Sequence, residues 1–266
     1  MAVVEKARSR DGTEIAYDRY GDGPAVVLVG GAWNDRMTKA PLAQLLAGEF
    51  SVYSYDRRGR GDSGDTPPYA VEREIEDLVA VIDASGGSAY AFGHSSGASL
   101  ALEATAAGAP ITRLAMYEPP YIVDRSRPPL PDDYIEHLEE LIAEGKRRDV
   151  FEYFMTVAAG MPAEMVKPML DSPMVEAMLP LAHTIPYDGR VMLRGSMNGQ
   201  PLPTRWTASV TVPSLVMDGG DSPAWMRNAA RALVGTLPDV EYRTLDGQDH
   251  AAAPEVIVPA LEEFFG

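Results

Sequence analysis

The stretch Gly93-His94-Ser95-Ser96-Gly97 places a serine two residues from a glycine on either side. An apolar run precedes it and a run of small residues follows it, so the serine stands where a strand turns sharply into a helix. Such a turn admits only small residues two positions from the nucleophile. The first N–H groups of the following helix point at a developing negative charge. The pattern predicts that Ser95 is a nucleophile and that the Ser96 N–H helps to bind an oxyanion.

A serine nucleophile needs a general base, and the chain has 4 histidines. His94 precedes the serine and should point into packing, and His137 stands among glutamates on a charged helix. His183 lies in a helical segment where it could contact substrate. His250 follows the last predicted strand in a polar loop, from which it can reach the serine. We therefore expect His250 to take the Ser95 proton and return it to the leaving group.

The elements that position these residues follow from hydrophobic periodicity. Apolar runs bounded by glycine and polar residues predict strands, and apolar residues at helical spacing predict helices. The predicted strands are residues 2–9, 14–20, 25–29, 51–56, 88–92, 112–117, 212–217 and 240–245. The predicted helices between and after them are residues 37–46, 71–84, 95–107, 223–235 and 255–265. This alternation indicates an α/β fold with a mostly parallel sheet and helices on both faces.

Residues 124–205 break this alternation and show one helical pattern after another. The predicted helices are residues 132–148, 151–159, 163–170 and 174–181, followed by a less regular stretch. Insertions at the carboxyl ends of parallel strands lie over the binding site of such sheets. We therefore expect a core of residues 1–123 and 206–266, with residues 124–205 forming a helical cap that acts as a lid.

Four stretches, taken together and in order, resemble the α/β-hydrolase superfamily. They are residues 29–33 (Val-Gly-Gly-Ala-Trp), 56–63 (Asp-Arg-Arg-Gly-Arg-Gly-Asp-Ser), 93–97 and 247–250 (Gly-Gln-Asp-His). In that family they are the oxyanion loop, an Asp-x-Arg-Gly-x-Gly-x-Ser loop, the nucleophile turn and the histidine loop. The resemblance implies the α/β-hydrolase fold with its variable cap at residues 124–205. It also implies that the Ala32 N–H is the second oxyanion donor and that the arginine-rich loop is structural.

The acid that would orient His250 remains open between two positions. In the family it usually follows the strand predicted at 212–217 in a Gly-x-x-Asp pattern, but here Ser222 holds that position and Asp221 stands one residue early. Another branch places the acid after the preceding core strand, where this sequence has Glu118. A carboxylate there needs a partner because an unpaired buried charge is costly. Glu118 and Asp221 therefore remain alternatives, and Asp218 ranks behind both.

The expected substrate pocket is apolar. Most of the 13 methionines fall within residues 124–205, and methionine is common on adaptable apolar binding surfaces. One tryptophan stands beside the expected oxyanion loop, and another lies near the Asp221 loop. The residues expected to line the pocket are Trp33, Met165, Met178, His183 and Trp225.

Composition excludes several classes of function. The 39 acidic against 23 basic residues give a net charge of −16, which disfavours nucleic-acid and membrane partners. The absence of cysteine excludes disulfides, thiolate metal sites and cysteine nucleophiles. No nucleotide-binding glycine pattern and no signal-peptide pattern is present. We expect a cytoplasmic monomer or homodimer that acts on a small molecule without a metal or cofactor.

These features together predict a serine hydrolase that cleaves an ester or lactone with a largely apolar acyl part. Haloalkane and epoxide hydrolysis are disfavoured because the resembling enzymes need an aspartate where Ser95 stands. The alternatives use the same triad for carbon–carbon bond hydrolysis, acyl transfer or a cyclisation step in secondary metabolism. A non-catalytic ligand-binding protein of the same fold is a further alternative.

Overall fold

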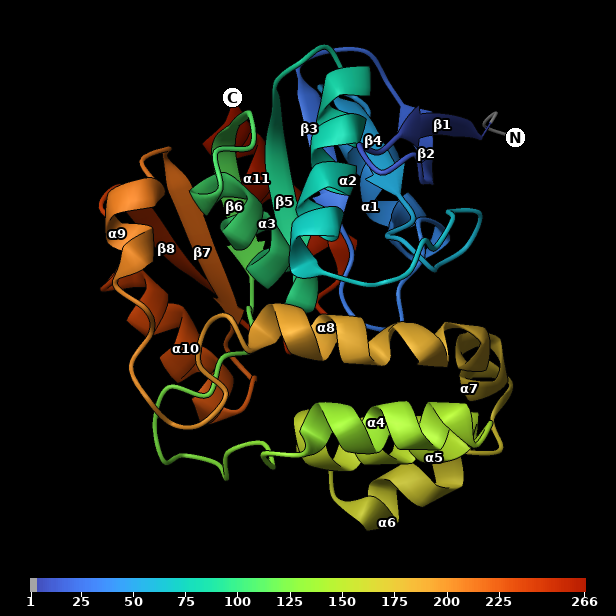
Figure 1. The fold of residues 1–266 in the computed structure, drawn as a ribbon. Helices are drawn as coiled ribbons and strands as arrows, with labels where there is room; N and C mark the ends of the chain where they lie inside the picture. Colours follow the sequence, from blue (N-terminus) through green and yellow to red (C-terminus); the bar gives the residue numbers. More distant parts are fainter. Residues whose placement is uncertain (1–3) are drawn as a thin grey trace.

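The structure, a computed structural model, describes residues 4–266, and in this range eight strands form one sheet (Figure 1). The order is β1-β2-β4-β3-β5-β6-β7-β8, antiparallel where β2 meets β1 and β4 and parallel elsewhere. The bounds are β1 (Glu5–Arg8), β2 (Glu14–Tyr20), β3 (Ala25–Val29), β4 (Ser51–Tyr55), β5 (Ala89–His94), β6 (Ile111–Tyr117), β7 (Ser214–Gly219) and β8 (Val240–Leu245). The predicted fold class is confirmed; residues 2 and 3 of the first predicted strand lie outside the described range.

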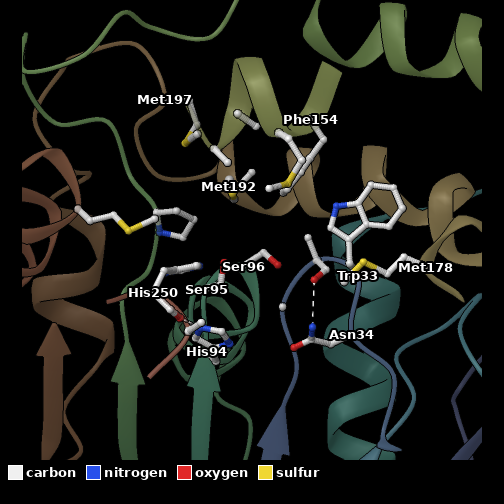
Figure 2. Close-up of a pocket in the computed structure, with 18 of the residues that line it drawn as sticks. Trp33, Asn34, His94, Ser95, Ser96, Phe154, Met178, Met192, Met197 and His250 are labelled. Atoms are coloured by element: carbon white, nitrogen blue, oxygen red, sulfur yellow. Dashed lines mark hydrogen bonds between the residues drawn. The ribbon is translucent and has the colours of Figure 1, made fainter. Parts of the chain in front are cut away.

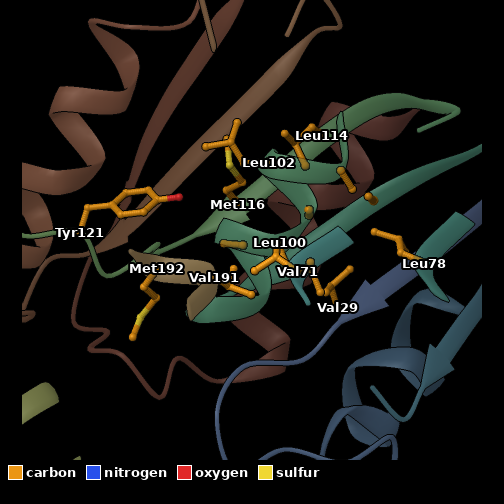
Figure 3. Packing of buried hydrophobic residues seen from close by; sticks show 14 of the residues in the cluster. Val29, Val71, Leu78, Leu100, Leu102, Leu114, Met116, Tyr121, Val191 and Met192 are labelled. Carbon is orange, nitrogen blue, oxygen red and sulfur yellow. The ribbon is translucent and has the colours of Figure 1, made fainter. Parts of the chain in front are cut away.

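Helices cover both faces of the sheet, as a buried parallel sheet requires. On one face, helices α1 and α11 pack on strand residues such as Val26 and Leu215. On the other face, α2, α3 and α10 pack on residues such as Val29 and Met116, and Figure 3 shows Leu100 of α3 among them. The bounds are α1 (Ala40–Leu46), α2 (Val71–Ala84), α3 (Ser96–Ala106), α9 (Arg205–Ser209), α10 (Ala224–Val234) and α11 (Pro254–Phe265).

Between β6 and β7 the chain forms a further layer of helices, which lies below the sheet in Figure 1. Helix α8 lies between the sheet and α4, and its Val191 and Met192 join the apolar cluster around α3 (Figure 3). None of the helices within residues 4–266 is long and apolar enough to cross a membrane. The bounds are α4 (Tyr134–Ala143), α5 (Arg147–Tyr153), a π-helical turn (Phe154–Ala158), α6 (Ala163–Val166), α7 (Pro173–Met178) and α8 (Ile185–Met192).

This helical layer differs from the sequence prediction in two places. The helix predicted at 132–148 is divided, because Gly145 adopts φ +73 and ends α4 before α5 begins. Helix α8 was missed because Pro186 and Gly189 interrupt its pattern. Pro186 lies in the first turn of α8. A backbone N–H at this position would have no acceptor within the helix, so proline costs no hydrogen bond there. Gly189 lies where α8 packs closely on α4, since a Cβ there would lie 2.5 Å from Ile135 Cδ1.

Helix α3 crosses the end of β3 in direct backbone contact at Gly97. A Cβ on Gly97 would lie 2.2 Å from the Val29 carbonyl oxygen and 2.6 Å from that of Gly30. Real Cβ atoms do not approach backbone oxygen this closely, so only glycine allows the helix to lie at this height. The contact brings the loop after β3 against the first turn of α3.

This contact predicts that Gly97→Ala destabilises the protein although alanine favours helices. The added methyl must displace α3 or β3, and overpacking of this kind costs about 1–3 kcal/mol. Gly48→Ala is the matched control, since nothing lies within 4 Å of a Cβ at that position. Chemical denaturation of both variants measures the effect, and equal free energies of unfolding would contradict it.

Candidate active site

Ser95 occupies the turn between β5 and α3 in a rarely populated backbone conformation, with φ 57 and ψ −131. Such conformations cost about 1–3 kcal/mol and persist only where the surroundings enforce them. Here the Ser95 N–H donates to the Tyr117 carbonyl at 2.9 Å, and the Ser95 carbonyl accepts from the Ala98 N–H at 2.9 Å. A Cβ on Gly93 would lie 2.4 Å from Ala98 Cα. The serine is therefore held rigidly on the predicted strand-to-helix turn.

His250 is bonded to one of the two alternative acids. Its Nδ1 lies 2.7 Å from Glu118 Oε2, and Glu118 Oε1 accepts from the Gly219 N–H at 2.8 Å. Glu118 is fully buried at the end of β6, with φ 48. An ionised carboxylate only accepts hydrogen bonds, so Nδ1 carries the proton and Nε2 is left as the acceptor.

The other two acids lie elsewhere. Asp221 is exposed, and its backbone N–H donates to the Gln248 carbonyl at 2.9 Å. Asp218 is buried and accepts from the Tyr242 hydroxyl at 2.7 Å. The structure thus brings Glu118, and neither of these aspartates, to the imidazole of His250.

The loop that carries His250 is held by a contact that the sequence did not reveal. Lys39 Nζ lies 2.9 Å from His94 Nδ1, and His94 Nε2 lies 2.9 Å from the His250 carbonyl oxygen. The ammonium can only donate, so His94 Nδ1 accepts and Nε2–H donates. Burial and the nearby Lys39 charge keep the pKa of His94 well below its usual value. Desolvation lowers the pKa of Lys39 to about 8. His94 is thus a neutral imidazole that links Lys39 to the backbone of His250, and it does more than fill space.

Ser95 and His250 face a cavity of about 330 Å³ (Figure 2). No hydrogen bond joins the Ser95 hydroxyl to His250 among the described residues, although both side chains lie on the same wall. No Asp, Glu, Lys or Arg side chain from residues 4–266 lines the cavity. The apolar side chains on its wall come mainly from Trp33, Pro120, Phe154, Met155, Ala158, Met178, Met192, Met197, Trp225 and Met226.

The expected pocket residues divide into two groups. Trp33, Met178 and Trp225 lie on the wall, and Trp33 packs against Phe154 with ring centroids 5.8 Å apart. Met165 and His183 do not line the cavity, which corrects the expectation for these two. Met165 belongs to α6 on the outside of the helical layer and is 58% exposed. The half-buried His183 turns its Nδ1 to within 3.0 Å of the Pro180 carbonyl oxygen.

Phe154, Met155, Met192, Met197 and Met226 were missed as wall residues. Four of them belong to residues 124–205, whose methionine enrichment pointed to the segment. Only the fold shows which side chains turn inward. Among residues 4–266, no group of three or more His, Asp or Glu side chains is arranged to bind a metal ion.

The loop after β3 lies against the serine turn. A Cβ on Gly31 would lie 2.9 Å from Ser95 Cβ and 2.9 Å from the His94 carbonyl oxygen. The Ala32 N–H that follows has no acceptor among the described residues. The Ser96 N–H is the first of α3, so it has no intrahelical acceptor either. Two free backbone donors therefore flank Ser95.

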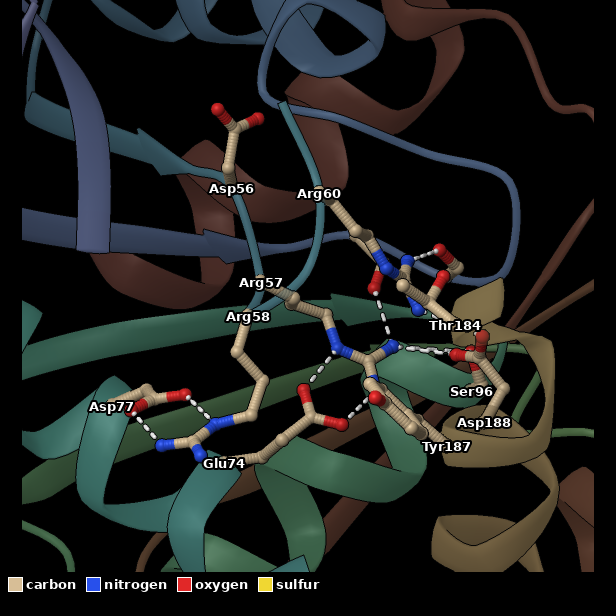
Figure 4. Close-up of polar contacts among 12 residues, drawn as sticks. Asp56, Arg57, Arg58, Arg60, Glu74, Asp77, Ser96, Thr184, Tyr187 and Asp188 are labelled. Atoms are coloured by element: carbon tan, nitrogen blue, oxygen red, sulfur yellow. Dashed lines mark hydrogen bonds and ion pairs between the residues drawn. The ribbon is translucent and has the colours of Figure 1, made fainter. Parts of the chain in front are cut away.

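The arginine-rich loop after β4 is buried. Arg57 forms paired contacts of 2.6 and 2.7 Å with Glu74, and Arg58 forms two of 2.7 Å with Asp77 (Figure 4). Arg60 Nη2 lies 2.7 Å from Asp188 Oδ2 of α8. The loop therefore connects α2 to the helical layer. The contact with Asp188 could not be foreseen, because α8 itself was not predicted.

Comparison with solved structures agrees with this description. An alpha/beta hydrolase from Sphaerobacter thermophilus is 56% identical and superposes with a TM-score of 0.92, over 98% of this chain and 100% of that chain. An enol-lactonase from Burkholderia xenovorans is 20% identical, with a TM-score of 0.69 over 98% of this chain and 99% of that chain. The second likeness concerns the fold alone.

Curated relatives match over shorter stretches. An N-formylmaleamate deformylase from Pseudomonas putida is 38% identical over 117 residues, which are 42% of this chain and 44% of the relative. A putative carbamate hydrolase from Escherichia coli is 33% identical over 87 residues, 32% of this chain and 33% of the relative. The chain thus matches less than half the length of these relatives. The sequence model of the alpha/beta hydrolase family matches residues 26–260. This chain belongs to the alpha/beta hydrolase family.

Proposed function

We propose that this protein is a serine hydrolase that cleaves an ester or lactone with a largely apolar acyl part. The observation that carries the proposal is the 2.7 Å contact between His250 and the buried Glu118, on the wall of the cavity that Ser95 also faces. A buried carboxylate, an imidazole and a serine on a strained turn form the parts of a nucleophilic triad. The relatives named a deformylase and a putative carbamate hydrolase support hydrolysis as the reaction class.

In this mechanism the Ser95 oxygen attacks the carbonyl carbon while His250 Nε2 takes the hydroxyl proton. The carbonyl oxygen becomes an oxyanion that the Ala32 and Ser96 N–H groups bind. Collapse of this intermediate breaks the bond to the leaving alcohol, which receives the proton from His250. Water then attacks the acyl-enzyme, its proton passes through His250 to Ser95, and the acid is released. Glu118 stays ionised and stabilises the imidazolium.

The hydrogen bond from Ser95 to His250 belongs to the complex with substrate. Hydrogen bonds between catalytic groups are often long or poorly aligned without substrate and tighten when it binds. The strained turn fixes the backbone of Ser95, so its hydroxyl oxygen can change position only by rotation about χ1.

The substrate class follows from the cavity wall. A charged acyl group would lose its hydration there without meeting a side chain of opposite charge, which is strongly unfavourable. Apolar groups gain about 25 cal/mol per Å² of surface that they bury. The volume of about 330 Å³ suits a small or medium-sized acyl group.

We also propose that residues 124–205 act as a lid over the core of residues 1–123 and 206–266. Phe154, Met178, Met192 and Met197 supply much of the cavity wall opposite Ser95 (Figure 2). The lid therefore contributes to substrate selection, while the core carries the reacting groups.

The first prediction concerns the nucleophile and its base. Ser95→Ala and His250→Ala should each lower turnover of a p-nitrophenyl ester by about 10⁶-fold, as in an assembled triad. Thermal unfolding of Ser95→Ala should change little, whereas His250→Ala should also lose stability because it leaves the buried Glu118 without its partner. A fluorophosphonate probe should label wild-type protein at Ser95. Wild-type turnover by Ser95→Ala would exclude the serine mechanism.

The second prediction concerns the acid. Glu118→Gln keeps the shape of the side chain but loses its charge, so turnover should fall by about 10⁴-fold. Asp221→Asn is the matched control because Asp221 is exposed and away from the imidazole, and its turnover should stay within about threefold. Steady-state kinetics on one ester compares them. A larger loss in Asp221→Asn than in Glu118→Gln would reverse the assignment.

The third prediction concerns the cavity wall. Met178→Ala removes apolar volume from the wall, so the preference among p-nitrophenyl esters should shift toward longer acyl chains. One methylene in an apolar pocket is worth about 1–3 kcal/mol, so the change should be graded along the series. Met165→Ala is the control, because Met165 is exposed and does not line the cavity. Identical chain-length profiles in the two variants would contradict a lid that lines the pocket.

A further inference from the structure

Asp188 carries a carboxylate from α8 of the lid into the interior of the core. It is fully buried, and its Oδ1 accepts from Arg57 Nη1 and from the Ser96 hydroxyl, each at 2.6 Å (Figure 4). Its Oδ2 accepts from Arg60 Nη2 at 2.7 Å. Burial alone would raise the pKa of Asp188, but the charges of Arg60 and Arg57 hold it below its usual value. One ionised lid residue therefore binds three core residues at once.

Arg60 extends this contact to the oxyanion loop. Its Nη1 donates to the Gly31 carbonyl oxygen at 2.5 Å, while its Nη2 contacts Asp188. The Gly31 carbonyl and the Ala32 N–H belong to the same peptide group, which is planar and trans, so they point in opposite directions. A guanidinium that fixes the carbonyl thus fixes the direction of the Ala32 N–H. Asp188, through Arg60, sets the orientation of one oxyanion donor.

The second donor is held by the same carboxylate. Ser96 is the first residue of α3, and its hydroxyl donates to Asp188. The Ser96 side chain therefore anchors the residue whose backbone N–H faces the oxyanion. Arg57 supports the arrangement from the other side, since its Nη1 also lies 3.3 Å from the Gly30 carbonyl oxygen. Both donors consequently depend on one residue that belongs to the lid.

We propose that Asp188 is a positioning residue for the oxyanion hole, so that the hole has its full strength only when α8 is docked on the core. This inference rests on the proposed serine-hydrolase function. Among the described residues Asp188 forms hydrogen bonds and ion pairs with Arg57, Arg60 and Ser96 rather than with Ser95 or His250, and it acts through Arg60 and Ser96. The buried arginines of the sequence motif thereby serve catalysis as well as folding.

Asp188→Asn tests the role. The amide keeps the shape, but it loses the charge and one acceptor, so the two N–H groups lose alignment. Misplacement of catalytic groups by about 1 Å costs on the order of 10²-fold, so kcat on a p-nitrophenyl ester should fall about 10- to 100-fold, with KM within about threefold. The inhibition constant of a matching trifluoromethyl ketone, whose adduct with Ser95 carries an oxyanion, should rise by about the same factor as kcat/KM falls. A competing apolar alcohol, which makes no oxyanion, should bind equally well.

Glu72→Gln is the matched control. Its partner Arg194 lies two residues after the end of α8, and this solvent-accessible pair also joins the lid segment to α2. An exposed pair contributes little, so kcat and both inhibition constants should stay within about twofold of wild type. Loss of activity in Glu72→Gln equal to that in Asp188→Asn would assign the effect to general loosening of the lid and overturn the proposal.

Arg60→Lys provides a second route if Asp188→Asn does not fold. Lysine keeps the charge but lacks the planar guanidinium that donates to the Gly31 carbonyl and to Asp188 at the same time. We therefore again expect a lower kcat with KM nearly unchanged. A folded variant of either kind with wild-type kcat and ketone affinity overturns the positioning role. Failure of both variants to fold also overturns it, because the network would then be required for the fold itself. A wild-type protein that neither hydrolyses esters nor binds the ketone instead refutes the proposed function on which this inference rests.

Discussion

The strained backbone at Ser95 is the constraint on which the rest of the structure depends. A residue with φ 57 and ψ −131 stays in that conformation only if every neighbour is fitted around it. Glycines at 93 and 97 let α3 fold back against β5 and β3, and Gly31 lets the next loop come within contact of the serine. The parallel sheet then brings β6 alongside, so that the Tyr117 carbonyl accepts the serine N–H. Sheet, loop and helix thus meet at this one turn.

Buried charge is the second organising feature. Arg57, Arg58 and Arg60 lose their hydration completely, and each is matched by a carboxylate from α2 or α8. Buried ion pairs add little net stability, but breaking one costs about 3–5 kcal/mol because a charge is left uncompensated. Such pairs favour the one packing of the surrounding elements in which every buried charge has its partner, because any other packing leaves a buried charge unpaired. Here they define how the loop after β4, the helix α2 and the layer of helices between β6 and β7 fit together.

The sequence predicted the parts of this molecule that depend on local pattern. Apolar runs located the sheet, and the glycines around Ser95 located the strand-to-helix turn. It could not choose between Glu118 and Asp221, because spacing along the chain does not tell which of two loop carboxylates the fold brings to a histidine in a third loop. Helix α8 was not predicted, because proline and glycine usually interrupt helices. Only the packing around Pro186 and Gly189 shows that both fit within this one. Met165 was assigned to the pocket since a short helix shows no clear inward face.

The uncharged wall of the cavity has a consequence for how an enzyme of the proposed kind would end its cycle. Ester cleavage converts a neutral bound substrate into a carboxylic acid that ionises at neutral pH. No Lys or Arg side chain from residues 4–266 lines the wall to pair with that anion, so the product binds in the cavity less favourably than the substrate did. Hydrolysis itself then drives clearance of the site, and the free acid is a poor competitor for the next ester. The same lack of charged side chains that favours binding of a neutral ester thus favours release of the acid product.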